Sequence, residues 1–372
     1  MKSRRIRLLT VAVFAIILLP LLSYSTSACT GIVLEGEDAT AVYGRTMEWG
    51  AFDWHAKAVV YPRGEKFQGT TPDGRNGISW EGKYGFLGIE LADRTAGDGM
   101  NEAGLAGGVF YHTGFAEYAV YDPALSDKSM APTDVLPYIL SNFSSISEVR
   151  EGMKDLRVVS VVDPTLNKVA PLHLMIVEPG GNSLVIEFTE GEQKLFDNPV
   201  GVIANNPTFD WHLQNLRNYG YLSNDSFEKK TWGDLEVTPL ASGSGLLGLP
   251  GDYTSPSRFV RATVLKEISR QTKGGFDTVN QFFRIMDSFN VPANQGEGST
   301  GGSNQEAGVP SDTQWTVAHD TNNLVTYFHT MYNRRIRKID LKELDFETGG
   351  ANKILLDEEK AQDVKEVTEE LQ

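Results

Sequence analysis

The chain contains a single cysteine, Cys29, among its 372 residues. One cysteine cannot form a disulfide within the chain, and it cannot build a cysteine-rich zinc site or a thiolate-held iron–sulfur cluster. The fold must therefore rest on a hydrophobic core, which a chain of this length with 40% hydrophobic residues can form. Charged residues make up 22%, a share that fits a globular protein and argues against a disordered chain or a polytopic membrane protein.

The first 28 residues have the pattern of a cleaved export signal. The leading segment carries four basic side chains: Lys2, Arg4, Arg5 and Arg7. An apolar run from Leu8 to Leu22 follows, and Ala28 suits the position before a signal peptidase cut. The run is shorter than the roughly 20 residues of a membrane span, although a retained anchor is the alternative. We therefore predict a periplasmic or secreted protein whose mature chain begins at Cys29.

The charge and the histidine pattern exclude several partners and cofactors. Removing residues 1–28 removes four positive charges and no acidic residue, so the formal net charge changes from −15 to −19. Nucleic-acid binding requires clustered Lys and Arg, so none is expected. The six histidines show no metal-ligand spacing of the HExxH kind, and no glycine-rich phosphate loop lies between a strand and a helix. We predict no metal and no cofactor.

A cysteine directly behind a signal peptide has two incompatible explanations. In a lipoprotein, Cys29 would carry lipid, but the usual lipobox leucine three residues earlier is replaced by Thr26. In an N-terminal nucleophile enzyme, cleavage would place an α-amino group on the same residue as the thiol. That amine titrates near 7.7 to 8.0 and can accept the thiol proton. The junction alone leaves both explanations open, and a Cys–His dyad is a third arrangement that sequence cannot exclude.

Short apolar runs separated by turn signals predict strands at both ends of the mature chain and helices between them. Expected strands are Thr30–Leu34, Ala41–Trp49, Lys57–Tyr61, Gly85–Leu91, Leu105–Tyr111, Leu172–Val177, Ser183–Glu187, Thr313–His319, Leu324–Met331 and Arg335–Leu341. Expected helices are Thr133–Asn142, Ile146–Met153, Trp211–Asn218, Pro256–Lys273 and Thr278–Phe289. This order predicts an α+β fold with layered sheets in one domain, residues 29–356, followed by an acidic tail, residues 357–372. Residues 294–308 have the composition of a surface loop.

Several motifs resemble those of the choloylglycine hydrolase family, which includes bile salt hydrolases and penicillin V acylases. In chain order they are CTG at 29–31, GRTMEW at 44–49, DGMNEAGL at 98–105, NNPTFDWH at 205–212, GSGLLGLPGDYT at 243–254 and SRF at 257–259. The resemblance covers nearly the whole mature chain. It implies a four-layer αββα N-terminal nucleophile (Ntn) hydrolase fold, a linear amide hydrolase acting on a small N-acyl substrate, and a homotetramer. The glycines of residues 243–251 are then interpreted as part of a pocket loop.

The resemblance also assigns roles at matching positions. Cys29 matches the nucleophile, and Arg45 and Arg258 match arginines that keep the thiol electropositive. Asn205 matches a side-chain donor to the oxyanion, and the backbone N–H of Tyr111 matches the second donor.

Glu48 stands where the family usually has Asp, so the resemblance implies a carboxylate that orients the amine, on a side chain one methylene longer. A solvent-facing strand position is the alternative for this residue. The position of Tyr111 is commonly Asn in bile salt hydrolases and Tyr in one group of penicillin V acylases, so the sequence favours acylase-like use. An N-acyl homoserine lactone acylase and a non-catalytic, lipid-anchored binding protein are the alternative functions.

Overall fold

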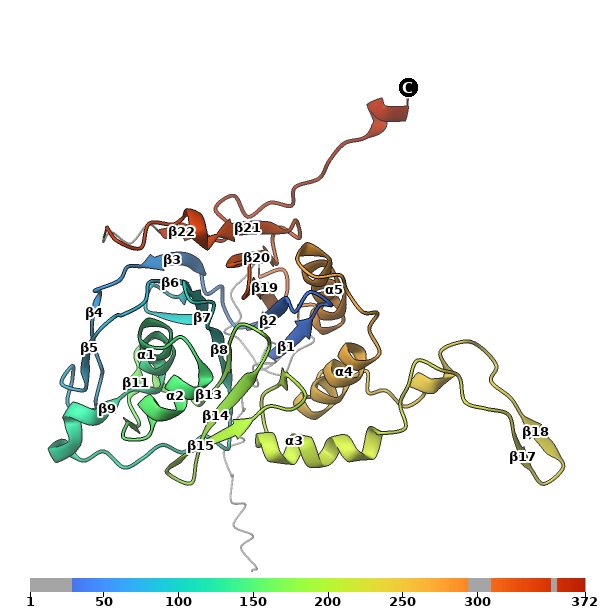
Figure 1. Cartoon of the computed structure of the whole chain (residues 1–372), viewed down its shortest axis with the longest axis horizontal. Helices are drawn as coiled ribbons and strands as arrows, with labels where there is room; N and C mark the ends of the chain where they lie inside the picture. Colours follow the sequence, from blue (N-terminus) through green and yellow to red (C-terminus); the bar gives the residue numbers. More distant parts are fainter. Residues whose placement is uncertain (1–28, 294–308, 349–352, 372) are drawn as a thin grey trace, which may run out of the picture.

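The computed structural model describes residues 29–293, 309–348 and 353–371. The predicted export signal, residues 1–28, and the predicted surface loop, residues 294–308, lie outside the described residues. Two antiparallel sheets pack face to face, and helices cover both outer faces (Figure 1). This arrangement is the predicted four-layer αββα fold. Among the described residues, no helix combines the length and apolar character needed to cross a membrane.

The two sheets are built from strands that lie far apart in the sequence. The six-stranded sheet has the order β16 (Val202–Ile203), β1 (Thr30–Glu35), β2 (Ala41–Glu48), β19 (Thr313–Asp320), β20 (Val325–Thr330) and β21 (Arg337–Asp340). The eight-stranded sheet has the order β15 (Glu192–Asp197), β14 (Ser183–Thr189), β13 (Leu172–Val177), β8 (Ala106–Tyr111), β7 (Thr95–Asn101), β6 (Phe86–Leu91), β3 (Lys57–Tyr61) and β22 (Lys353–Leu355). Short paired strands outside the two sheets are β4 (Lys66–Gln68), β5 (Ser79–Glu81), β9 (Ser129–Met130), β10 (Arg157–Val158), β11 (Val162–Asp163) and β12 (Lys168–Val169).

Helices α1 (Val135–Asn142) and α2 (Ile146–Met153) cover the eight-stranded sheet, and α4 (Ser255–Glu267) and α5 (Phe276–Met286) cover the six-stranded sheet (Figure 1). Helix α3 (Phe209–Leu216) lies beside α4. The predicted helix over 256–273 ends six residues early. The chain leaves the helix because Thr272 forms a bridge with Gly36, and the Glu37 N–H donates to the Thr272 carbonyl at 2.9 Å.

The hydrophobic core forms two clusters, one on each face of the eight-stranded sheet. Strand β13 is apolar apart from His173: Leu174 and Ile176 pack toward α1 and α2, while Met175 and Val177 pack toward the other sheet. Successive side chains of a strand point to opposite faces, and both faces of an inner layer are covered. The absence of polar alternation in this strand therefore reflects burial on both sides.

Strand β7 was not predicted, because it contains Gly97, Asp98 and Gly99 and lacks a typical strand pattern. The structure gives Gly99 a packing reason: a Cβ there would lie 2.5 Å from the carbonyl oxygen of Leu87 on the neighbouring strand. Close backbone approach is a recognised use of glycine within a sheet. Local propensity was overridden here by the packing of adjacent strands.

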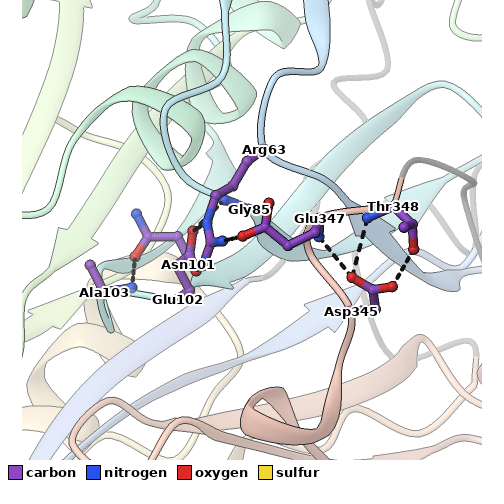
Figure 2. Close-up of polar contacts among 8 residues, drawn as sticks. All are labelled: Arg63, Gly85, Asn101, Glu102, Ala103, Asp345, Glu347 and Thr348. Atoms are coloured by element: carbon purple, nitrogen blue, oxygen red, sulfur yellow. Dashed lines mark hydrogen bonds and ion pairs between the residues drawn. The ribbon is translucent and has the colours of Figure 1, made fainter.

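The turn between β7 and β8 also anchors the C-terminal part of the chain. Asn101 Oδ1 accepts the Ala103 N–H at 3.0 Å and so stabilises the turn, and Arg63 bonds both carboxylate oxygens of Glu102. Figure 2 shows the same arginine reaching Glu347. The motif at 98–105 thus has a structural function, since its Asn and Glu build a turn and hold a distant segment.

Two segments project from the layered body (Figure 1). One carries a hairpin of β17 (Lys230–Trp232) and β18 (Leu235–Val237), on which Trp232 is 67% and Leu235 is 64% exposed. The other is the acidic C-terminal segment, which is exposed from 358 to 371 and ends in a short 3-10 turn, Thr368–Leu371.

Candidate active site

Cys29 immediately precedes β1, and its side chain is buried with 1% exposure. The sulfur lies 3.9 Å from Sδ of Met47 on the adjacent strand β2. The glycine that follows in the motif is required by packing, since a Cβ at Gly31 would lie 2.8 Å from Phe110 and 2.9 Å from Ile203. Strands from both sheets therefore converge behind the cysteine and fix its position.

Arg45 lies on β2 with its side chain fully buried between the sheets. Its guanidinium donates to the Val109 carbonyl at 2.5 Å and to Met47 Sδ at 3.2 Å. Burial by itself lowers the pKa of Arg45, but the negative charges that Cys29 and Asp98 can carry outweigh it and raise the pKa above its ordinary value. A cation fixed beside the sulfur is the arrangement that favours a thiolate.

Arg258 reaches the same place from the first turn of α4. It donates to the Cys29 carbonyl, to Thr30 Oγ1 at 2.7 Å and to Asn205 Oδ1 at 2.7 Å. Burial lowers the pKa of Arg258 to about 10, and the charges of Glu48 and Cys29 oppose that effect. The guanidinium is therefore cationic at neutral pH and binds the main chain of the cysteine.

Asn205 follows β16 and connects three parts of the site. Its backbone N–H donates to Ser255 Oγ at 2.8 Å, its Nδ2 donates to the Tyr111 carbonyl at 2.8 Å, and its Oδ1 accepts from Arg258. A primary amide carries two hydrogens, and the bond to Tyr111 uses one of them. The second hydrogen is the one that could meet an oxyanion.

The backbone N–H of Tyr111 points to the same side of β8 as Asn205. In a strand, successive residues direct their N–H and C=O groups to opposite edges. The His112 N–H donates to the Pro171 carbonyl at 2.7 Å, so residue 112 faces β13. Residue 111 faces the other edge, where its carbonyl bonds Asn205. The two predicted oxyanion donors therefore approach from one direction.

Glu48 is not at a solvent-facing strand position, because only 2% of it is exposed. Its Oε1 accepts from Thr313 Oγ1 at 3.0 Å, and an irregularity in β19 between Thr313 and Trp315 shifts the register at this point. Burial raises the pKa of Glu48 to about 7, against the lowering effects of Arg258 and Arg45. This carboxyl group can therefore gain or lose a proton near neutral pH.

A pocket of about 560 Å³, part of it open to solvent, leads to the cysteine. Cys29, Arg45 and Tyr111 lie on its wall together with apolar side chains that include Trp54 and Leu172. An ion pair of Arg94 and Asp163, with 3.4 Å between Nε and Oδ2, borders the pocket. Sequence reasoning did not identify these two residues. Residues 243–251, interpreted from sequence as a pocket loop, are not part of its lining.

Comparisons with known proteins agree with this geometry. The family model described as linear amide C–N hydrolases, choloylglycine hydrolase family, matches residues 29–355. A bile salt hydrolase/transferase of Clostridium perfringens is 32% identical over 321 residues, covering 85% of this chain and 93% of its own. The chain belongs to the choloylglycine hydrolase family. It is a linear amide C–N hydrolase with the Ntn hydrolase fold.

Two further relatives span both named activities of the family. A penicillin V acylase of Pectobacterium atrosepticum is 25% identical over 370 residues, covering 94% of this chain and 90% of its own. A solved conjugated bile acid hydrolase from Clostridium perfringens superimposes with a TM-score of 0.77 at 28% identity, covering 91% of this chain and all of the other. The family resemblance seen in the motifs is thereby confirmed.

A buried cluster of His112, His173 and Glu187 lies near the candidate active site. Its candidate ligand atoms are within 4.8 Å of one another, although the residues are too far apart in sequence for spacing to reveal them. The two rings are stacked, with centroids 4.4 Å apart and planes 5° from parallel. An imidazole binds metal in its ring plane, so two stacked rings cannot both direct a lone pair at one ion. Burial lowers the pKa of both histidines to about 3, and they remain neutral.

Proposed function

We propose that Cys29 is the nucleophile of this hydrolase and that it becomes active only when residues 1–28 have been removed. The observation that carries the proposal is the position of the thiol on the wall of the pocket, between two buried arginines. Arg45 lines the same pocket and bonds Met47 Sδ, which lies 3.9 Å from the thiol sulfur, and Arg258 binds the main-chain carbonyl of Cys29. Cleavage would add the α-amino group that serves as the base.

The proposed reaction is acyl transfer through a thioester. The neutral amine takes the thiol proton, the sulfur bonds to the carbonyl carbon, and the π electrons move to the oxygen. Asn205 Nδ2 and the Tyr111 N–H stabilise this oxyanion. As the carbonyl re-forms, the C–N bond breaks and the protonated amine passes its proton to the leaving nitrogen. Water then attacks the thioester by the same steps, which releases the acid and restores the thiol.

We propose that the preferred substrate has an aromatic acyl group of the penicillin V type. Tyr111 and Trp54, which line the pocket, both contact Trp49, with ring centroids 5.4 Å and 5.2 Å apart. An aromatic wall favours an aromatic ring through offset and edge-to-face contacts. Conjugated bile salts are the second candidate, because the family relative with 32% identity is named for that activity.

A substrate panel tests this choice. It contains penicillin V, glycine- and taurine-conjugated bile salts and acyl homoserine lactones, and it is scored against the Cys29→Ala variant as the blank. The proposal expects penicillin V to give the highest kcat/KM, with no turnover above the blank in the variant. Faster turnover of bile salts or of lactones would overturn the substrate assignment while leaving the nucleophile intact.

We further propose that the mature protein is exported to the periplasm or secreted and carries no lipid on Cys29. The alternative is a lipid-anchored binding protein without catalysis. Intact-mass analysis of protein from the cell envelope and the medium separates the two. A mass increment of a diacylglyceryl group on Cys29 would favour the alternative, because lipidation consumes both reactive groups.

We propose a homo-oligomer, a tetramer by family resemblance, in which the projecting hairpin is covered by another copy of the chain. Trp232 and Leu235 support this, since they expose large apolar side chains on a segment away from the body. Light scattering should report about four chains for the native protein. The double variant Trp232→Ser/Leu235→Ser should have a smaller mass, and an unchanged mass would exclude the hairpin as the contact.

A further inference from the structure

A buried polar cluster of Tyr43, Asp98 and His319 lies between the two sheets, outside the contacts of the proposed mechanism. Tyr43 on β2 and His319 on β19 come from the six-stranded sheet, and Asp98 on β7 comes from the eight-stranded sheet. All three are fully buried. The Asp98 carboxylate accepts from the Tyr43 hydroxyl at 3.1 Å and lies 2.6 Å from His319 Nε2. His319 Nδ1 lies 2.8 Å from Thr326 Oγ1.

The surrounding main chain makes room for this carboxylate. A Cβ at Gly108 on β8 would lie 2.4 Å from Asp98 Oδ2 and 2.6 Å from the Tyr43 hydroxyl. The rings of Tyr43 and His319 are stacked, with centroids 5.9 Å apart and planes at 11°. The carboxylate is therefore confined by backbone on one side and by two aromatic hydrogen-bond partners on the other.

The cluster connects to the cysteine through Arg45. Tyr43 and Arg45 are two residues apart on β2, so their side chains point to the same face. Arg45 donates to the carbonyl of Val109, which follows Gly108, and to Met47 Sδ, which lies 3.9 Å from the thiol. The position of a Cβ at Gly108, 2.4 Å from Asp98 Oδ2, is also 3.4 Å from Arg45 Cδ, so the carboxylate and the arginine side chain meet beside this glycine. The charges of Asp98 and Cys29 both act on Arg45.

Charged and titratable groups from several strands surround Asp98 and Arg45. Tyr43 and Arg45 on β2 and His319 on β19 face Asp98. The groups that act electrostatically on Arg45 include Cys29, Asp98, Tyr43 and Glu48, and Arg45 in turn acts on His173 of β13. Because a carboxylate partly neutralises an adjacent guanidinium, its removal leaves more positive potential at the sulfur.

We propose that Asp98 moderates the positive potential of Arg45 at Cys29, with Tyr43 and His319 holding the carboxylate in place. This inference rests on the proposed role of Cys29 as nucleophile. A thiol needs a lowered pKa to be a thiolate at neutral pH, but a thiolate of lower pKa is a weaker nucleophile. Asp98 limits the positive potential at the thiol, so that a thiolate forms at neutral pH and remains a good nucleophile.

The test is the pH dependence of alkylation of the mature protein by iodoacetamide. Cys29 is the only cysteine, so the reaction reports one thiol. In Asp98→Asn, the midpoint of the rate profile should move about one pH unit lower, the lower end of the range for a nearby charge. The plateau rate above the midpoint should fall about threefold, because nucleophilicity follows pKa with a coefficient of about 0.4 to 0.5.

The matched control is Glu90→Gln on the neighbouring strand β6. Glu90 is also a buried carboxylate bonded to a tyrosine, with 2.9 Å to the Tyr61 hydroxyl, and it does not line the pocket. Its replacement should leave the midpoint where it is. A role for Asp98 in folding alone would lower the amount of native protein without moving the midpoint of the folded fraction.

A second variant decides the matter if Asp98→Asn does not fold. Tyr43→Phe keeps the Asp98 carboxylate but removes the hydrogen bond by which the Tyr43 hydroxyl disperses its negative charge. The carboxylate then offsets more of the Arg45 charge, so the midpoint of the alkylation profile should move to higher pH, by less than the shift in Asp98→Asn. An unchanged midpoint in folded Asp98→Asn, or in folded Tyr43→Phe, overturns the inference. Alkylation needs no substrate, so failure of this inference is distinguishable from failure of the proposed hydrolysis, which the substrate panel reads separately.

Discussion

The variant Asn205→Ala removes one proposed oxyanion donor and two buried side-chain hydrogen bonds in a single substitution. The bonds are those to the Tyr111 carbonyl at 2.8 Å and from Arg258 at 2.7 Å. Loss of one preformed oxyanion donor costs about 10² to 10³ in kcat, or about 2.7 to 4 kcal/mol of transition-state stabilisation. We expect a loss of that size.

The same substitution also weakens the fold. Each buried group left without its partner costs about 1 to 3 kcal/mol, so the unfolding free energy should fall by about 2 to 6 kcal/mol. A domain with about 5 to 15 kcal/mol of stability can absorb much of this, and we expect a folded protein at 25 °C with a lower Tm. Circular dichroism and urea unfolding measure the stability, and steady-state kinetics on penicillin V measure kcat.

The control is Ser255→Ala, which removes the acceptor of the Asn205 backbone N–H at 2.8 Å and leaves the donating side chain in place. It should cost about 1 to 3 kcal/mol of stability while kcat falls less than about tenfold. If folded Asn205→Ala turns over within about threefold of the native enzyme, Asn205 does not donate to the oxyanion, because loss of such a donor costs about 10² to 10³ in kcat.

Three further variants test other parts of the site and the fold. Burial raises the pKa of Glu48 to about 7 from an ordinary 4.5, so its contribution to stability is greatest below about pH 4.5 and declines by about 3 kcal/mol as the pH rises through 7. Urea unfolding of Glu48→Gln across that window should lack this decline, and an identical slope would contradict the assigned burial effect. Gly44→Ala should abolish folded protein or cost several kcal/mol of stability, since its Cβ would lie 2.1 Å from the Val317 carbonyl oxygen. The control is Gly251→Ala, whose Cβ would have no atom of the described residues within 4 Å, so this variant should unfold like the native protein. Arg45→Lys keeps the positive charge but not the planar guanidinium. The midpoint of thiol alkylation should therefore stay within about half a pH unit of the native value, while kcat/KM falls at least about tenfold. An unchanged kcat/KM would show that the charge alone suffices.

Much of the layered fold can be predicted from local patterns, because the apolar residues of most strands and helices are spaced as their buried faces require. The exceptions have physical causes. Strand β7 contains two glycines and an aspartate that only tertiary packing explains, and α4 ends early because Thr272 bridges Gly36. The hairpin at 230–237 exposes aromatic and apolar residues, so patterns based on buried faces could not predict its strands.

The site was predictable to the extent that motifs mark it. The resemblance named residues that the structure brings together around Cys29, including Asn205 and Arg258 from distant segments. Spacing could not reveal the ion pair at the pocket or the partners of Asp98, because each joins residues that are distant in sequence and meet only in the folded structure; Asp98 and His319 meet where the two sheets pack against each other. The sequence left a solvent-facing alternative open for Glu48, and the structure shows instead that it is buried, with Thr313 of β19 and Arg258 of α4 among its neighbours.

The proposed mechanism requires the thiol of an N-terminal Cys29 to carry the acyl group during turnover. Top-down mass spectrometry of the enzyme, acid-quenched during reaction with penicillin V, measures this directly. We expect a chain that begins at Cys29 and carries one phenoxyacetyl increment as a thioester on that residue, with no increment in Cys29→Ala. A turning-over chain that retains residues before Cys29, or an acyl group on a different residue, would contradict it.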